Sequence, residues 1–170
     1  RQMKEFNVAD TETSKSARVL KTAVTPRPIA WVSTESEDGH DNLAPISFFS
    51  PISPNPPMVM INLSRKNHVG DLKDTTQNIL DTEEFAINIT TEKNLEQMDH
   101  TSKVLPPDES EFDLAGIERA DCRTIAAPRV ADAAVAMECT LYDVHDIHGR
   151  HMILGDVEYF HVGESVMHDG

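Results

Sequence analysis

The stretch RPIAWVSTESEDGHDNLAPISFFSPIS, residues 27–53, decides the fold class. Its first part, 27–36, is rich in strand-forming residues, and EDGH (37–40) supplies a turn with Gly39. Residues 41–53 then resume an extended pattern, so we expect a β-hairpin. Pro45 lacks a backbone N–H, which places the second strand at a sheet edge or a bulge.

The rest of the chain continues this β-rich pattern. PNPP (54–57) predicts a rigid turn, and the apolar run MVMINLS (58–64) predicts a buried strand. Residues 83–90 alternate as in a strand, and 135–147 and 151–162 flank HGR, a tight hairpin turn. The strands do not alternate with helices in the βαβ manner, which favours a mainly β antiparallel barrel with short helical insertions.

Two helices and one long connection interrupt the strands. Leu72, Thr75, Thr76 and Ile79 recur at helical spacing, with Gly70 or Asp71 as the cap. Residues 91–102 predict a short amphipathic helix with Leu95 and Met98 on its apolar face and Thr91 as a possible cap. Residues 105–119 form a polar connection with little periodicity, of a kind that often serves as a binding element or lid.

Composition indicates one soluble domain spanning residues 1–170, because 39% of the residues are hydrophobic and 26% are charged. There is no long apolar run and no apolar signal-peptide core, so we expect no membrane partner. Cys122 and Cys139 fit neither a zinc spacing nor a disulfide framework. Two reduced thiols favour a cytoplasmic location.

The chain is strongly acidic, with a formal net charge of −14. Such a charge repels phosphates and argues against nucleic acid as a partner. The acids are scattered rather than gathered in a tail, which suits a solvated surface in a high-salt cytoplasm, where screening weakens self-repulsion. A halophilic source is therefore our hypothesis, and an ordinary acidic protein is the alternative.

Positive charge is concentrated in LSRKNHVGDLKDTTQNI, residues 63–79. Arg65, Lys66 and Lys73 come just before the predicted helix or at its start, where backbone N–H groups are unpaired. Ser64 and a following threonine add hydroxyl donors. Residues 64–76 predict a phosphate-ester site, and a solvated basic turn explains the charges equally well.

The ordered set TPRPIAWVST, DGHDNLAPISFFSPISPNPPMVMINLS, KDTTQNI, EEFAINI, SEFDLAGIE, APRVADAAVAMECTL and MILGDVEYFHV resembles the flavin reductase-like family of FMN-binding split barrels. The resemblance covers about residues 20–165. It implies a closed antiparallel barrel that forms a homodimer, with FMN, or less readily FAD, near the dimer interface.

The resemblance also implies contacts for each part of the flavin. Side chains that match the segment along the ring or ribityl chain are Ser33 and Thr34. The strand whose backbone lines the isoalloxazine carries Asn42, Ala44, Pro45, Ile46 and Ser47. The matches to the phosphate segment are Ser64, Arg65, Lys66, Thr75 and Asn78.

The chemistry implied is hydride transfer from NAD(P)H to flavin N5, followed by electron transfer to a small-molecule acceptor or a partner redox protein. Because the chain lacks GxGxxG, NAD(P)H is expected as a transient substrate. The resemblance also implies that His161 contacts nicotinamide or flavin. A half-buried histidine on a strand, without such a contact, explains this residue equally well. The alternatives are a non-catalytic FMN electron carrier and an acidic β-barrel module without flavin.

Other chemistry finds less support in the sequence. No nucleophile elbow surrounds Ser47 or Ser50, so a hydrolase is not expected. His145, His148 and His151 flank the reversal at Gly149, and we do not expect all three to converge on a metal. Aromatic residues on strands are usually buried, so we place Trp31 in the core or an interface rather than on the flavin.

Overall fold

The computed structural model describes residues 2–64, 73–103, 105–106 and 108–168. One antiparallel sheet contains seven strands: β1 (Ala30–Glu35), β2 (Asp41–Ile46), β3 (Phe49–Pro54), β4 (Pro57–Ser64), β5 (Glu84–Ile89), β8 (Val135–Ile147) and β9 (Arg150–Val162). A second, small sheet pairs β6 (Arg119–Ala120) with β7 (Arg129–Val130). The helices are α1 (Thr13–Ala23), α2 (Asp74–Thr82), α3 (Leu95–His100) and α4 (Glu111–Leu114), with 3₁₀ turns at Val8–Asp10, Glu92–Asn94 and Glu164–Val166.

The large sheet is strongly curled. Its strand order is β2-β1-β5-β8-β9-β4-β3, so β2 and β3 form opposite edges. Only Ser47 and Phe48 connect these two strands in the chain. A link this short spans at most about 11 Å from Ile46 to Phe49. The two edges must therefore approach each other, and Asn62 N in β4 donates a hydrogen bond to Phe48 O at 2.9 Å.

The expected barrel closure is wrong. Each strand of the order from β2 to β3 pairs with its neighbours, but among the described residues β2 and β3 do not pair with each other. The sheet therefore stays open between these two edge strands. Pro45 in β2 and Pro51 and Pro54 in β3 lack the N–H groups that a closing ladder requires. The expected single strand over 41–53 accordingly breaks at residues 47–48, whereas the prediction of an edge strand at Pro45 is confirmed.

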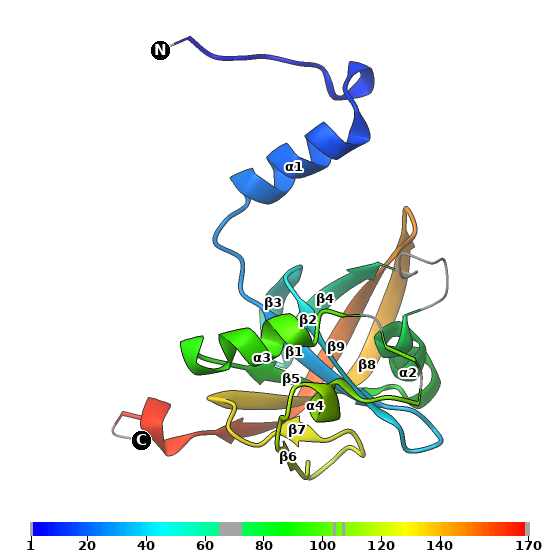
Figure 1. Ribbon diagram of the computed structural model, residues 1–170, viewed down its shortest axis with the longest axis vertical. Helices are drawn as coiled ribbons and strands as arrows, with labels where there is room; N and C mark the ends of the chain where they lie inside the picture. Colours follow the sequence, from blue (N-terminus) through cyan, green and yellow to red (C-terminus); the bar gives the residue numbers. More distant parts are fainter. Residues whose placement is uncertain (1, 65–72, 104, 107, 169–170) are drawn as a thin grey trace.

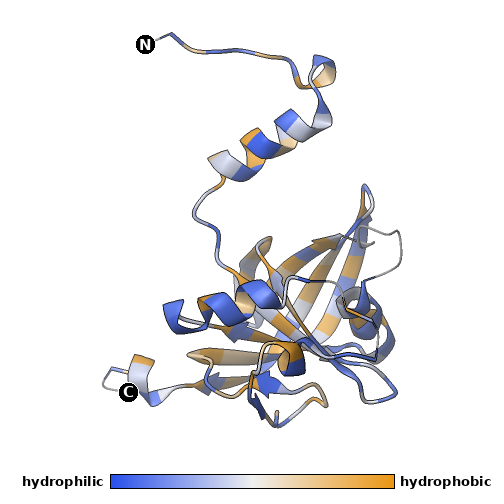
Figure 2. Cartoon of the chain, viewed as in Figure 1, coloured by the Kyte–Doolittle hydropathy of each residue, from blue (hydrophilic) through white to orange (hydrophobic). Residues whose placement is uncertain are grey.

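Two hydrophobic cores hold the sheet. The larger core lies inside the curl and includes Ile61, Ile79, Phe85 and Ile153 (Figure 2). The predicted strand over 58–64 is confirmed as β4. It contributes alternate, buried residues to this core, and the residues between them are half-buried. The β8–β9 hairpin, with its turn at His148–Gly149, matches the prediction.

A second core covers the outer face of β1 and β2. It gathers Trp31, Leu43, Met98, Phe112, Ile117 and Val130. The indole Nε1 of Trp31 donates to Thr101 Oγ1 at 2.8 Å, and the core placement of this residue is confirmed. In the predicted helix over 91–102, Met98 is buried as expected, but Leu95 is 58% exposed, so its assignment to the apolar face is wrong.

The segment 105–119 is packed rather than purely polar. It contains α4, and Phe112 and Ile117 enter the second core, which sequence periodicity did not indicate. Glu111 is buried, and its Oε2 accepts hydrogen bonds from Asn42 Nδ2 and Leu43 N, both at 2.9 Å. Burial raises the pKa of the Glu111 carboxyl, and the hydrogen bond from Leu43 opposes that rise. Glu111 thus fixes the segment to the edge strand β2.

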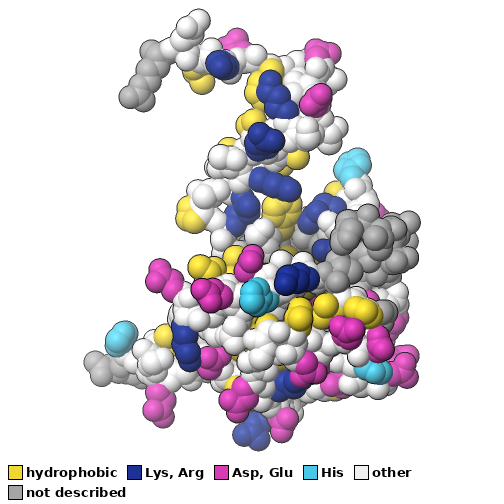
Figure 3. All heavy atoms as spheres, viewed as in Figure 1, with side chains coloured by type: hydrophobic (Ala, Val, Ile, Leu, Met, Phe, Trp, Pro, Cys, Tyr) yellow, Lys and Arg dark blue, Asp and Glu magenta, His cyan; other side chains and the backbone are white. Residues whose placement is uncertain are grey.

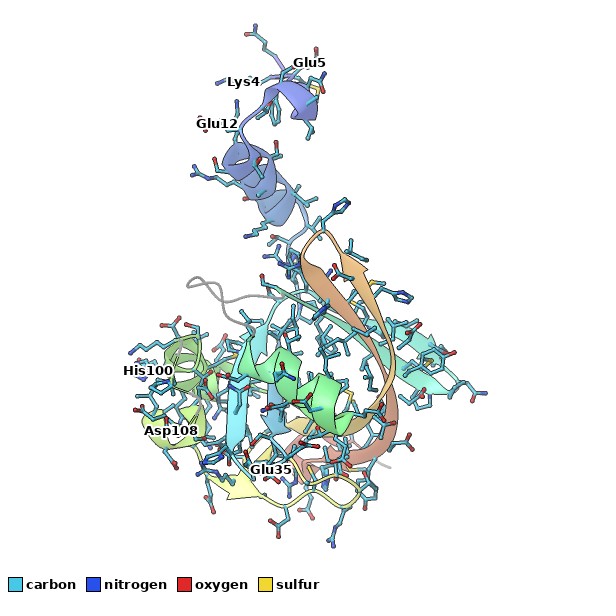
Figure 4. All side chains as sticks on the ribbon, turned by 90° about the vertical axis from the view of Figure 1, so that its right-hand side faces the viewer. Lys4, Glu5, Glu12, Glu35, His100 and Asp108 are labelled. Carbon is cyan, nitrogen blue, oxygen red and sulfur yellow. The ribbon has the colours of Figure 1, made fainter. Side chains whose placement is uncertain are left out.

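The N-terminal helix α1 was not predicted. It has no buried residue and stands away from the sheet (Figure 1). Side chains that precede it or lie at its start, such as Lys4, Glu5 and Glu12, project away from the barrel (Figure 4). Within the described part of the chain, every helix is too short or too polar to cross a membrane.

Helix α2 begins at Asp74, two or three residues later than the expected caps imply. Lys73 occupies its N-cap position, without a side-chain capping bond. The expected caps, Gly70 and Asp71, lie outside the described residues. Both cysteines, Cys122 and Cys139, are free thiols.

Gly155 on β9 tests the packing of the larger core. A Cβ at this position would lie 2.5 Å from Phe85 Cζ, and Phe85 is fully buried. We expect Gly155→Ala to lower the free energy of unfolding by about 1–3 kcal/mol through overpacking. Urea unfolding of Gly155→Ala, Phe85→Leu and the double variant measures the coupling, which we expect to be favourable. Strict additivity would contradict the contact.

Glu111 should make stability depend on pH. Its pKa is raised above the ordinary value of 4.5, so the native state binds more protons than the unfolded state between these two pKa values. The contribution of Glu111 to the free energy of unfolding therefore falls as the pH rises through this window. Glu111→Gln keeps an acceptor oxygen and removes the charge. Urea unfolding from about pH 4 to about pH 7 should show the variant gaining stability relative to the parent, and a constant difference would contradict this.

Candidate functional site

The meeting point of the two sheet edges is hollow. We call it the seam, formed by Pro45–Phe48 on one side and Asn62–Ser64 of β4 on the other. A cavity of about 110 Å³ is lined by Ala44, Pro45, Ile46, Lys73, Asp74, Thr75, Thr101, Ser102, Lys103, Leu105 and Glu111. A cavity of about 170 Å³ is lined by Lys21, Pro45, Ile46, Ser47, Phe48, Asn62, Leu63, Ser64, Lys73 and Arg150. The two cavities adjoin, because both are bounded by Pro45, Ile46 and Lys73.

Arg150 is held at the floor of the seam by β4. It opens β9 directly opposite Ser64 in the ladder. Its Nε donates to Asn62 Oδ1 at 2.7 Å, Nη1 to Ser64 Oγ at 3.0 Å and Nη2 to Asn62 O at 2.8 Å. Its guanidinium carbon also lies 4.9 Å from the centre of the Phe48 ring. These contacts fix the orientation of the cation before any ligand arrives.

Lys73 is the second cation of the seam. Burial lowers its pKa, and repulsion from Arg150 lowers it further; burial also lowers the pKa of Arg150. Within the described ranges, neither side chain forms an ion pair with a carboxylate. Two half-buried cations that repel each other would both gain from an anion placed between them. The 170 Å³ cavity therefore suits a phosphate.

Sequence reasoning found only part of this pair. Lys73 belongs to the basic stretch but was not among the predicted phosphate contacts. Arg150 was missed because it is distant in sequence and sits in what reads as an ordinary hairpin turn. Of the predicted phosphate contacts, Ser64 lines the 170 Å³ cavity and Thr75 the 110 Å³ cavity. Arg65 and Lys66 lie outside the described residues.

The predicted ring-binding strand does reach the seam. Ala44, Pro45 and Ile46 border the 110 Å³ cavity, and Ser47 borders the 170 Å³ cavity. A third cavity, of about 410 Å³, continues past Ser47 and Phe48 toward α1. Its walls are largely apolar and include Leu20, Val24, Pro26, Pro28, Phe49 and Met60. The edge strand thus runs between a cationic cavity and an apolar one.

Ser33 and Thr34 are buried inside the protein. Ser33 Oγ accepts from Asn88 Nδ2 at 3.1 Å, and Thr34 Oγ1 accepts from Asn78 Nδ2 at 3.0 Å. Their contacts with a flavin stay predictions, and their observed role is to tie the β1–β2 hairpin to its neighbours.

Asn42, Thr75 and Asn78 also join this hairpin to α2. Thr75 Oγ1 donates to Asn42 Oδ1 at 2.6 Å. Asn42 and Asn78 line a separate cavity of about 370 Å³, whose acidic residues are Glu37, Asp38, Asp41, Asp74, Asp81, Asp108 and Glu109. Phosphate would be repelled there, so Lys73 and Arg150 mark the more favourable place for it.

His161 lies on β9, outside the three cavities of the seam. Its Nε2 is 2.5 Å from Oε1 of the buried Glu138. Burial works to raise the pKa of Glu138, but hydrogen bonds from Thr124, His161 and the Arg123 amide hold it at about 2. The predicted nicotinamide contact of His161 is not tested by this arrangement.

The three histidines around the β8–β9 turn have separate surroundings. His145 Nε2 lies 3.3 Å from Asp143 Oδ2, and His151 Nε2 lies 4.0 Å from Asp146 Oδ2. His148 occupies the turn itself, with φ at +48°.

The donor set of the seam fits a flavin nucleotide. Lys73, Arg150 and Ser64 offer cationic and hydroxyl donors for a phosphate, and β2 lies at the edge of the large sheet, where a flat polar-rimmed ring can approach its backbone. The apolar wall beyond Phe48 adds surface for an aromatic group.

Relatives of known sequence extend over most of the chain. An uncharacterized protein of Aquifex aeolicus is 37% identical over 163 residues, which cover 96% of this chain and 83% of that protein. The uncharacterized protein YwrF of Bacillus subtilis is 32% identical, with 88% of this chain and 75% of that protein covered.

Solved structures share the fold. Nitrilotriacetate monooxygenase component B from Bacillus cereus superposes with a TM-score of 0.92 at 30% identity, covering 100% of this chain and 86% of that one. The Pseudomonas fluorescens 2-nitrobenzoate 2-nitroreductase NbaA gives a TM-score of 0.85 at 28% identity, covering 96% and 79%. Because residues 22–169 match the family described as flavin reductase like domain, the chain belongs to that family.

Proposed function

We propose that this protein binds FMN at the seam and acts as an oxidoreductase that takes hydride from NAD(P)H and delivers electrons to an acceptor. The observation that carries the proposal is the pair of half-buried cations, Lys73 and Arg150, beside β2, an edge strand of the large sheet. Family membership and the nitroreductase named among the structural neighbours support redox chemistry.

The phosphate of the nucleotide would be held by Lys73, Arg150 and Ser64. Arg150 can offer its charge while its existing bonds to Asn62 keep it in place. This pre-organisation lowers the entropic cost of binding the phosphate. Because these cations form no ion pair with a carboxylate among the described residues, the pocket can also overcome the repulsion from a chain of net charge −14.

The ring would lie along Ala44–Ser47 of the edge strand. Backbone N–H and C=O groups on the open side of β2 can pair with the polar edges of an isoalloxazine. Pro45 removes one N–H from that edge, and the ring therefore has to present a donor or an apolar atom at this point. Bound flavin supplies hydride acceptance at N5, so the protein itself needs no general base.

A non-catalytic FMN electron carrier is the second candidate. The two cavities that Lys73 lines beside the predicted ring-binding strand measure only about 110 and 170 Å³, which leaves limited room there for a nicotinamide beside a bound ring. The larger cavity of about 410 Å³ borders this strand at Ser47. Both candidates use the same phosphate site and differ in access to the ring.

We further propose that the protein forms a homodimer. Ile52 on β3 and Tyr159, Phe160 and Val162 on β9 expose apolar surface that a second copy would cover. The proposed acceptor is a small molecule or a partner redox protein, and the proposed location is the cytoplasm.

Removal of the Lys73 charge tests the phosphate site. We expect Lys73→Ala to weaken FMN binding by about 10- to 100-fold, the worth of one charge-assisted hydrogen bond. Riboflavin lacks the phosphate, and its affinity should stay unchanged. Lys93→Ala is the matched control, because Lys93 pairs with Asp132 at 2.7 Å and lines neither seam cavity. Equal losses for FMN and riboflavin, or no loss, would place the phosphate elsewhere.

Stopped-flow mixing of the FMN-loaded protein with NADH or NADPH separates the two candidates. We expect the flavin absorption band to bleach after mixing, because a nicotinamide that reaches the ring reduces the flavin by hydride transfer. A stable band with both nucleotides, together with reduction by dithionite, would favour the carrier. A protein that takes up neither FMN nor FAD would contradict both.

A further inference from the structure

A second cluster of functional side chains lies away from the seam. Cys122, Glu138 and His161 bring a thiol sulfur, a carboxylate oxygen and an imidazole nitrogen within 4.8 Å of one another. They come from three parts of the chain: the segment between β6 and β7, strand β8 and strand β9. None of the three lines a seam cavity, and the β6–β7 segment lies at the end of the molecule opposite α1 (Figure 1).

Glu138 is the anchor of this cluster. It is fully buried, although it sits on a strand whose neighbouring position, Cys139, faces the larger core. Its Oε1 accepts from Arg123 N at 2.7 Å, and its Oε2 accepts from Thr124 N at 2.6 Å. A carboxylate held by two backbone amides keeps one fixed direction, as a ligand to a metal ion must.

The other two groups complete a set of mixed donors. His161 Nε2 lies 2.5 Å from Glu138 Oε1, and its side chain is 19% exposed. Cys122 is half-buried, so the cluster is reachable from solvent. One sulfur, one nitrogen and one oxygen are the donors that zinc takes in proteins, and three protein ligands leave a fourth position open.

We propose that Cys122, Glu138 and His161 form a binding site for one zinc-class divalent ion. The charges suit such an ion, because a thiolate and a carboxylate together neutralise its two positive charges and the imidazole stays neutral. No sequence motif indicates this site, because 15 and 22 residues separate the three ligands and this spacing matches no zinc motif.

Binding requires a small rearrangement of the ligands. Zinc–oxygen and zinc–nitrogen bonds are about 2.0–2.1 Å long and zinc–sulfur bonds about 2.3 Å, so the ion must enter between Glu138 and His161 and move them apart. The thiol proton of Cys122 leaves to solvent. His161 carries its one ring proton on Nδ1 when Nε2 binds the ion, so that the imidazole is neutral in the complex. Oε1 then exchanges its bond with His161 for a bond to the metal, while Arg123 N and Thr124 N continue to hold the carboxylate.

A bound ion would cross-link the segment between β6 and β7 to the large sheet. Cys122 belongs to the segment between β6 and β7, which reaches the main sheet through hydrogen bonds from Arg123 and Thr124 to Glu138. A metal bond would fix the same segment to both β8 and β9. Because the ion would bind the native state and not the unfolded chain, it would raise the melting temperature in proportion to the logarithm of its concentration.

The test uses the 170-residue chain without added flavin, after chelation and then titration with Zn²⁺ or Co²⁺. We expect one equivalent of Zn²⁺ per chain by metal analysis, and tetrahedral Co²⁺ bands at longer wavelengths than the flavin absorption. Cys122→Ala should weaken binding by about 100-fold, and His161→Gln by about 10-fold or more. Cys122→Ser should retain the shape of the site and lose the sulfur-to-cobalt charge-transfer band.

Cys139→Ala is the matched control. Cys139 is the other thiol of the chain, it neighbours Glu138 on the same strand, and its sulfur faces the opposite side, where it contacts Met137 O. This variant should keep the Zn²⁺ stoichiometry and the Co²⁺ bands of the parent. Equal metal binding by Cys122→Ala and Cys139→Ala, or failure of the parent to bind one equivalent, would overturn the proposal. These readouts are independent of FMN affinity and of NAD(P)H oxidation, so failure here leaves the proposed function untouched.

Discussion

The two-residue link between β2 and β3 is the constraint on which the molecule depends. Ser47 and Phe48 join strands that lie at opposite edges of a seven-stranded sheet. A sheet so connected has to curl until its edges meet, and prolines on both edges prevent them from pairing. The result is a hollow lined by unpaired backbone, which a fully closed ladder would have filled with its own hydrogen bonds.

Basic and acidic side chains line different cavities near the start of α2. Lys73 faces the seam with Arg150, whereas the neighbouring Asp74 also borders the acid-rich cavity. The acidic side chains are spread over the barrel, and Lys and Arg gather along α1 (Figure 3). An average charge therefore says little about local binding: the strongly acidic chain contains a place where an anion would be stabilised.

Local patterns were sufficient to predict most of the strands and the β8–β9 turn, because alternation and turn residues are properties of neighbouring positions. The failures required distant residues to meet. Barrel closure depended on how two edges align in space. Arg150 and Lys73 line one cavity, and Asn42 donates a hydrogen bond to Glu111, although the two residues of each pair are distant in sequence. The helix α1 was overlooked because it packs on no core whose periodicity would reveal it.

Arg27 lies between the N-terminal helix and the large sheet: its Nη1 donates to the carbonyl oxygens of Lys21 and Val24 at the end of α1, and its guanidinium carbon lies 5.7 Å from the centre of the Phe48 ring. Lys21 in turn forms part of the wall of the 170 Å³ cavity. Lys21 is thus part both of α1 and of the 170 Å³ cavity. A ligand that is stabilised by Lys21 must, by thermodynamic linkage, favour the position of α1 in which the Lys21 ammonium lines the cavity. A partner that binds α1 in a different position must weaken ligand binding by the factor by which the ligand weakens binding of that partner.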